Sequence, residues 1–185
     1  MVQNVDPTEN FNAIANGIEM KELEADGSVT PQMYGQLLAI YLYQHDLCNA
    51  KYLWNRIPSQ CKVEYPELNH IWSVGKAMWL RDYPGVYSAL NSQPWSDNVA
   101  EIIKAVQQEV KKQATQLVCR AYTSVSLTTA AALMGTTPDA VAQLRDWRVE
   151  GNMVTPPKPL PSPPIVTSSE EQLGKLTDFV SFLEN

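Results

Sequence analysis

The sequence predicts a mostly α-helical protein: a short α-solenoid of TPR-like helical repeats, then a winged helix with a small β-sheet, a proline-rich linker and a C-terminal helix. Three observations predict this order. Apolar residues recur with helical spacing over most of the first 122 residues. Signals for helix, strand, helix, turn, helix and hairpin then follow one another, which is the layout of a winged helix. Last, six prolines lie between residues 155 and 164, ahead of an amphipathic stretch.

These changes in pattern divide the chain into four parts. Residues 1–95 form a helical repeat region, and residues 96–155 form a long helix with a winged-helix subdomain. Residues 156–167 are a proline-rich linker, because proline fixes its own backbone angle and lacks a hydrogen-bond donor. Residues 168–185 are a C-terminal amphipathic helix.

The repeat region opens with three helices. The first is expected to end near Asp26-Gly27, and Thr30-Pro31 begins the second as an N-cap followed by proline at the first helical position. Asp46 caps the third helix, and Pro58 ends it. Their buried faces follow helical spacing and comprise Phe11, Ile14, Ala15 and Ile18, then Tyr34, Leu37, Leu38, Tyr41 and Leu42, then Ala50, Leu53, Trp54 and Ile57.

The same unit recurs after 36 residues, the interval from Asp46 to Asp82. Paired helices with a period near 34 to 40 residues are typical of α-solenoids. A non-repetitive helical bundle with a chance match is the alternative. The matched pairs are Leu42 with Met78, Asp46 with Asp82, Ala50 with Val86, Trp54 with Leu90 and Pro58 with Pro94. The second unit opens with a helix whose apolar side carries Ile71, Val74, Met78 and Trp79. We expect Trp54, Trp72 and Trp79 in the core.

A long helix connects the repeats to the winged helix. It begins at Ser96 and keeps helical spacing to about Tyr122, with an apolar face of Val99, Ile102, Ile103, Val106, Val110, Leu117, Val118 and Ala121. The β-branched and aromatic stretch 122–126 is then expected to be a strand, followed by a helix over 127–134 that Gly135 ends. A helix from Thr137-Pro138 through Trp147 and a hairpin over residues 148–154 complete the subdomain.

Composition argues against two functional classes. The net charge of −6 and the excess of acidic over basic residues within 122–155 do not suit a nucleic-acid binder, whose footprint is basic. The sequence holds no metal-binding histidine motif, phosphate loop or nucleophile elbow, so we expect neither an enzyme nor a cofactor. His45 and His70 are expected to be surface-exposed or hydrogen-bonded, and Cys48 and Cys119 to pack as small hydrophobic residues.

Three widely spaced cysteines and the absence of a leader-like N-terminus predict a soluble protein of the cytoplasm, the nucleus or both. No apolar run is long enough to cross a membrane.

The C-terminal helix needs a surface on which to dock. Two overlapping capping boxes, Ser168 with Glu171 and Ser169 with Gln172, predict its start. Its stripe, with the spacing of a coiled-coil or bundle seam, comprises Leu173, Leu176, Phe179, Val180 and Leu183. Burying these side chains is worth roughly 8–15 kcal/mol. Ordering ~16 residues costs a comparable amount, so the helix must pack on a partner or fold back onto its own chain.

Five stretches resemble the PCI family, which is shared by the proteasome lid, the COP9 signalosome and initiation factor three. The resemblance is to its signalosome members and covers nearly the whole chain, with an ending that separates them from the other two branches. The stretches are Tyr34–Leu42, Ala50–Pro58, Ile71–Gly75, Arg81–Tyr87 and Leu176–Asn185.

The resemblance implies a noncatalytic structural subunit in a complex that removes the ubiquitin-like modifier NEDD8 from cullin-RING ubiquitin ligases. In that complex another subunit carries the metalloprotease activity, winged helices join edge to edge, and C-terminal helices gather into one bundle. The expected partners are therefore other signalosome subunits. The partner-binding residues would be Leu173, Leu176, Phe179, Val180 and Leu183 in the bundle, and Val149, Met153 and Val154 at the winged-helix edge.

Three other functions stay open from sequence alone. The chain could be a PCI scaffold of the proteasome lid or of initiation factor three, or a nucleic-acid-binding winged-helix protein. No residues support a hydrolase.

Overall fold

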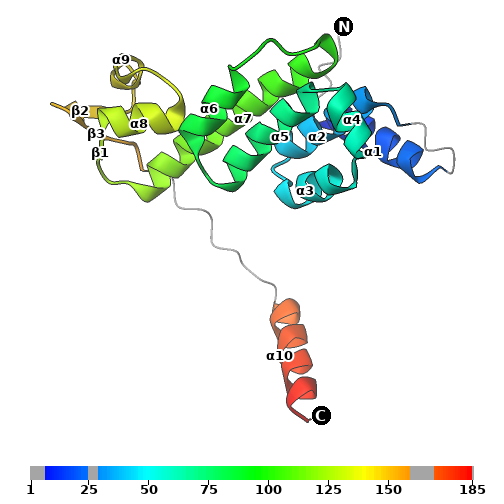
Figure 1. Cartoon of the computed structure of the whole chain (residues 1–185). Coiled ribbons are helices and arrows are strands. Elements are labelled where there is room, and N and C mark those ends of the chain that lie inside the picture. Colours follow the sequence, from blue (N-terminus) through cyan, green and yellow to red (C-terminus); the bar gives the residue numbers. More distant parts are fainter. Residues whose placement is uncertain (1–6, 25–28, 159–168, 185) are drawn as a thin grey trace, which may run out of the picture.

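A computed structural model of the chain describes residues 7–24, 29–158 and 169–184. It is mostly helical, with one small antiparallel sheet, and confirms the predicted fold class. Figure 1 shows the repeat helices gathered around the first part of α7, with the sheet, α8 and α9 at its other end. The elements are α1 (Pro7–Leu23), α2 (Pro31–Tyr43), α3 (Leu47–Arg56), α4 (Ser59–Glu64), α5 (Glu67–Trp79), α6 (Tyr83–Leu90), α7 (Asp97–Ala121), β1 (Val125–Ser126), α8 (Leu127–Met134), α9 (Pro138–Ala142), β2 (Arg148–Glu150), β3 (Met153–Thr155) and α10 (Ser169–Glu184).

The turns of the two repeats have the same construction. The Asp46 carboxylate accepts the Asn49 N–H at 3.0 Å, and the Asp82 carboxylate accepts the Gly85 N–H at 3.1 Å. The Asp46 N–H donates to the Tyr41 carbonyl at 2.9 Å, and the Asp82 N–H donates to the equivalent Ala77 carbonyl at 3.0 Å. This match supports the repeat over a chance similarity.

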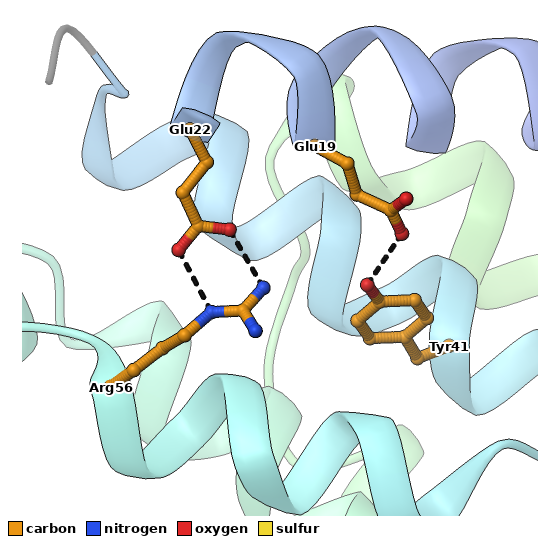
Figure 2. Close-up of polar contacts among 4 residues, drawn as sticks. All are labelled: Glu19, Glu22, Tyr41 and Arg56. Atoms are coloured by element: carbon orange, nitrogen blue, oxygen red, sulfur yellow. Dashed lines mark hydrogen bonds and ion pairs between the residues drawn. The ribbon is translucent and has the colours of Figure 1, made fainter. Parts of the chain in front are cut away.

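The first helix is held onto the repeats by polar contacts at its C-terminal end (Figure 2). The Arg56 guanidinium donates two hydrogen bonds to Glu22, at 2.8 and 2.7 Å, and the Tyr41 hydroxyl donates to Glu19 at 2.6 Å. Burial, reinforced by the bond to Glu19, raises the pKa of Tyr41 well above its usual range. The N-terminal helix therefore covers the open end of the repeat stack.

Apolar side chains divide into two buried clusters that both include residues of α7. The larger cluster contains the repeat helices and Val99, Ile102, Ile103, Val106 and Val110 of α7. The smaller one contains Val118 of α7 with Val125, Ala130, Ala131, Met134, Val141 and Val154. Leu117 and Ala121, expected on the buried face, are exposed, while Ala114 is buried.

A carboxylate of α5 joins the repeats to the start of α7. Glu67 accepts the Ser96 N–H at 2.8 Å and the Ser96 hydroxyl at 2.9 Å, and it also accepts a hydrogen bond from the Tyr65 hydroxyl. Ser96 makes no side-chain cap of its own. The sequence predicted Ser96 as the helix start but not Glu67 as the group that satisfies its N–H.

Two features of the repeats differ from expectation. Helix α4 was not predicted, because its six residues carry no buried side chain and give no apolar pattern. Trp79 was expected in the core but is 50% exposed. Trp54 and Trp72 are half-buried, and their rings stack with centroids 5.4 Å apart. Helix α1 ends at Leu23, and the predicted end at Asp26-Gly27 lies outside the described residues.

The winged helix has the predicted order with shorter elements. The predicted strand over 122–126 is reduced to Val125–Ser126, and the helix expected to run through Trp147 ends at Ala142. Only Val141 of α9 is buried and Leu144 is exposed, so this segment has no continuous apolar face that would hold a longer helix on the core. Gly135 ends α8 in the left-handed conformation, at φ 60°, as predicted.

Candidate interaction surfaces

Helix α10 exposes an apolar face and lies apart from the rest of the chain (Figure 1). Its exposed side chains include all five that the sequence predicted for partner binding, with Leu183 at 76% and Phe179 at 69%. At 100° per residue these five span about a third of the helix circumference, and Phe182, also exposed, widens the stripe to about half. The five are Leu173, Leu176, Phe179, Val180 and Leu183.

The two predicted capping boxes of this helix are not tested. Ser168 lies outside the described residues, and the side chains of the remaining members are also outside the described set.

The wing gives a second candidate surface, which is smaller than predicted. The strand order is β1-β3-β2, so Met153 and Val154 belong to the central strand, with both neighbours already paired. Val154 is fully buried and packs in the small core, so its side chain is not exposed on the wing. Val149 and Met153 are exposed, and only Val149 lies on an edge strand.

A third surface is a pocket of about 540 Å³ between the two repeat turns and α7. Its lining includes the apolar side chains Met78, Trp79, Val86 and Val110. It also includes His45, Asp46, Cys48, Arg81 and Gln113. Its volume falls in the range of ligand-sized clefts, and its lining is of mixed polarity.

The histidines differ from expectation, since each has a buried ring nitrogen without a partner among the described residues. These atoms are Nε2 of His45 and Nδ1 of His70. Burial lowers the pKa of His45, against the opposing charge of Glu109. His45 therefore stays neutral at physiological pH and does not add positive charge to the pocket.

The cysteines also differ in part from expectation. Cys48 was expected to be packed but is exposed and lines the pocket. Cys119 is half-buried, and burial raises the pKa of its thiol. The Cys119 thiol therefore lacks the lowered pKa of a nucleophile.

Within the described residues, no group of three His, Cys, Asp or Glu side chains could hold a metal ion. No described helix is both long and apolar enough to cross a membrane. Helix α9 stands where a DNA-binding winged helix has its recognition helix, but it has only five residues and carries Asp139 in its first turn. Its other exposed charges, such as Arg145 and Asp146, largely cancel.

Sequence patterns had no signal for the pocket, because it is assembled from two turns and a distant helix. Phe182 could have been found from its neighbours on the helix, since it lies three and six residues from Phe179 and Leu176.

Comparison with known proteins adds a family match. The profile described as the CSN8/PSMD8/EIF3K family matches residues 28–164. The chain is 43% identical over 173 residues to the COP9 signalosome complex subunit 8 of Danio rerio, covering 90% of this chain and 91% of that protein. It is 42% identical over 181 residues to the Xenopus laevis protein of the same name, covering 95% and 93%. The Drosophila melanogaster protein of that name is 29% identical over 182 residues, covering 95% and 97%.

Proposed function

The chain belongs to the CSN8/PSMD8/EIF3K family, and we propose that it is a noncatalytic assembly subunit of a COP9 signalosome, the complex that removes NEDD8 from cullin-RING ubiquitin ligases. The observation that carries this proposal is the match to signalosome subunits over nine-tenths of both chains. The family description also names two other branches, but the relatives that match along nearly the full length carry the signalosome name.

The exposed face of α10 supports an assembly role. A helix of 16 residues with one apolar face is marginal in water, so it gains order by packing against other helices. Phe179 and Phe182 have large side chains, each worth roughly 1.5–3 kcal/mol when fully buried. We propose that α10 enters a bundle with C-terminal helices of other signalosome subunits, through Leu173, Leu176, Phe179, Val180 and Leu183.

The wing supplies the second proposed contact. Strand β2 is at the edge of the described sheet, so its backbone can pair with a strand of a neighbouring subunit. Val149 on this strand and Met153 beside it would cover the junction. Both contacts are with other subunits, and we propose that they occur in the cytoplasm and the nucleus.

Co-purification tests the bundle contact. Phe179→Asp places a charge in the centre of the apolar stripe, where docking would bury it, and should abolish recovery with the other signalosome subunits. Thr177→Asp adds the same charge to the polar side of the helix and should leave recovery unchanged. Deletion of residues 168–185 should give a chain that no longer enters the complex.

Two results would contradict the proposal. One is full incorporation of both the deletion and Phe179→Asp into the complex. The other is equal loss with Phe179→Asp and Thr177→Asp, which would show that incorporation does not depend on the apolar face. Circular dichroism of each variant checks that the helical repeats stay folded.

A further inference from the structure

We propose that isolated copies of this chain associate with one another through α10, packing their apolar sides together in a small parallel helical bundle. The occupant of this surface, when no other subunit is present, is therefore a second copy of the same chain. The inference concerns the isolated chain and does not depend on the proposed assembly role. The surface, called the six-residue face, consists of Leu173, Leu176, Phe179, Val180, Phe182 and Leu183.

The single chain leaves the six-residue face uncovered. Figure 1 shows α10 apart from the folded body, and the six side chains are 51–79% exposed. A helix of 16 residues is marginal in water unless another surface covers its apolar side. The face is therefore open to another molecule, and the helix gains stability from that contact.

Another copy of α10 is the most apolar surface that a solution of this chain offers. Elsewhere in the described part of the chain, an element carries at most two large exposed apolar side chains, as Met20 and Leu23 on α1 or Trp79 on α5. Single exposed side chains of this kind are normal on a protein surface. Apolar contact is non-directional, so pairing α10 with α10 removes the most apolar area from water.

The area of the six-residue face is sufficient for association between copies. Six large side chains that are 51–79% exposed present roughly 600–800 Å² of apolar surface per chain. Specific interfaces bury about 600–1,000 Å² per partner. The face reaches this range without help from the folded body. Because it lies toward the lower end, we expect association that depends on protein concentration.

The spacing of the apolar residues indicates a bundle with more than two helices. Apolar residues at positions a, d and g of a heptad form a wider face than the a and d seam of a two-stranded coiled coil. This wider pattern is typical of helices in a bundle, where each helix contacts two neighbours. Phe182 widens the face further on the side of Phe179. The heptad positions are a for Leu173 and Val180, d for Leu176 and Leu183, and g for Phe179.

Charge favours parallel copies over antiparallel ones. In a parallel arrangement, position g faces position e of a neighbouring copy, so Gln172 faces Thr177 and Phe179 faces Glu184. Neither pair brings two like charges together. An antiparallel arrangement places e against e, which sets Glu170 against Glu184 of the neighbouring copy. Like charges at these flanking positions oppose that orientation.

The linker leaves room for several folded bodies around one bundle. Residues 159–168 separate Lys158 from Ser169, and ten residues span up to about 33–36 Å when extended. A body of ~150 residues has a radius of gyration of about 15 Å. Bodies attached at the same end of a parallel bundle can therefore lie side by side without overlapping.

Sedimentation equilibrium of the full chain without other subunits tests the proposal. Between about 2 and 200 μM, the weight-average mass should rise from that of the monomer to more than twice that value. Phe179→Asp places a charge near the centre of the six-residue face and should keep the chain monomeric. Ser181→Asp adds the same charge on the opposite side of the helix and should associate like the parent chain. Deletion of residues 168–185 should also give a monomer.

Disulfide formation tests the orientation. Parallel copies bring identical d positions together, so under mild oxidation Leu176→Cys should link two copies through position 176 several-fold faster than Ser181→Cys does through position 181. Peptide mass spectrometry identifies the linked positions and recognises any link through the exposed native Cys48. Equal rates at positions 176 and 181 would contradict the parallel packing.

Four results would overturn the proposed association. They are a parent chain that stays monomeric up to 200 μM, equal weakening by Phe179→Asp and Ser181→Asp, association that survives the deletion, and a mass that stops at twice that of the monomer. Circular dichroism of each variant checks that the helical repeats stay folded. Because no other subunit is present, failure here would leave the co-purification test of the proposed function unaffected.

Discussion

His45 and Arg81 occupy equivalent positions in the two repeat turns, and both have a left-handed backbone, with φ angles of 56° and 57°. Each is followed by the aspartate that caps the next helix, Asp46 or Asp82. The 36-residue repeat therefore extends to a backbone conformation that L-residues rarely adopt. This conformation lets a helix end and the next begin within three residues.

The left-handed conformation at Arg81 predicts the effect of two substitutions there. Arg81→Val should lower the free energy of unfolding by about 1–2 kcal/mol, because a β-branched residue is strained at positive φ. Arg81→Gly should not destabilise the chain, because relief of this strain offsets the greater freedom of glycine when unfolded. As a control, Lys104→Gly in the exposed interior of α7 should cost about 1 kcal/mol. Urea unfolding measures all three, and a stable Arg81→Val would contradict the prediction.

Gly135 and Gly151 form a matched pair for a second prediction. Both have positive φ, but an added Cβ would lie 2.6 Å from the Tyr87 ring at Gly135 and meets nothing within 4 Å at Gly151. Gly135→Ala should therefore cost about 2–4 kcal/mol, from backbone strain and overpacking together. Gly151→Ala should cost only the backbone share, about 1 kcal/mol. Equal losses in thermal or urea unfolding would show that the contact with Tyr87 has no effect.

Helices with both an apolar stripe and a capping residue could be predicted from sequence. Thr30 and Asp46 cap α2 and α3 as expected, because their side chains act on N–H groups only three residues away. Trp79 and the end of α9 were predicted wrongly, because the exposure of a tryptophan and the length of a helix depend on which surfaces other elements cover. Short elements without a core face, such as α4, leave no pattern to detect.

For the candidate surfaces too, sequence patterns predict what lies within one element but not what depends on packing between elements. The stripe of α10 could be predicted, because one helix contains all its members. The burial of Val154 could not, because it depends on β3 being the central strand between β1 and β2. A three-stranded order is set by contacts between residues that are far apart in the sequence, such as Val125 and Val154.

Tyr87 predicts a loss of stability at alkaline pH. Burial raises its pKa to about 12, above the value near 10 of an unfolded tyrosine. The contribution of this raised pKa to the free energy of unfolding is therefore complete below pH 10 and is lost as the pH rises toward 12. Tyr87→Phe should be less stable than the parent chain at pH 8, through loss of the 3.2 Å bond to the Leu133 carbonyl, and the difference should narrow above pH 10. Urea midpoints at pH 8, 9, 10 and 11 measure it, and a constant difference would contradict the assignment.

Glu67 predicts a large effect from one partly buried carboxylate. Glu67→Ala should lower the free energy of unfolding by about 2–3 kcal/mol, because it leaves the Ser96 N–H at the start of α7 without its charged acceptor. As a control, Glu64→Ala removes an exposed carboxylate that accepts a hydrogen bond from Gln60 within α4. It should cost less than about 0.5 kcal/mol. Denaturant unfolding followed by circular dichroism compares the two, and equal losses would exclude a special role for Glu67.

Helix α7 contributes to both buried clusters, with Val110 in one and Val118 in the other. A helix of 25 residues is about 37 Å long and much stiffer than a loop. Rotation of the wing by a bound neighbour would therefore tilt α7 as a rigid rod and shift the far repeat turns. A displacement at one end of α7 is in this way transmitted to the other end.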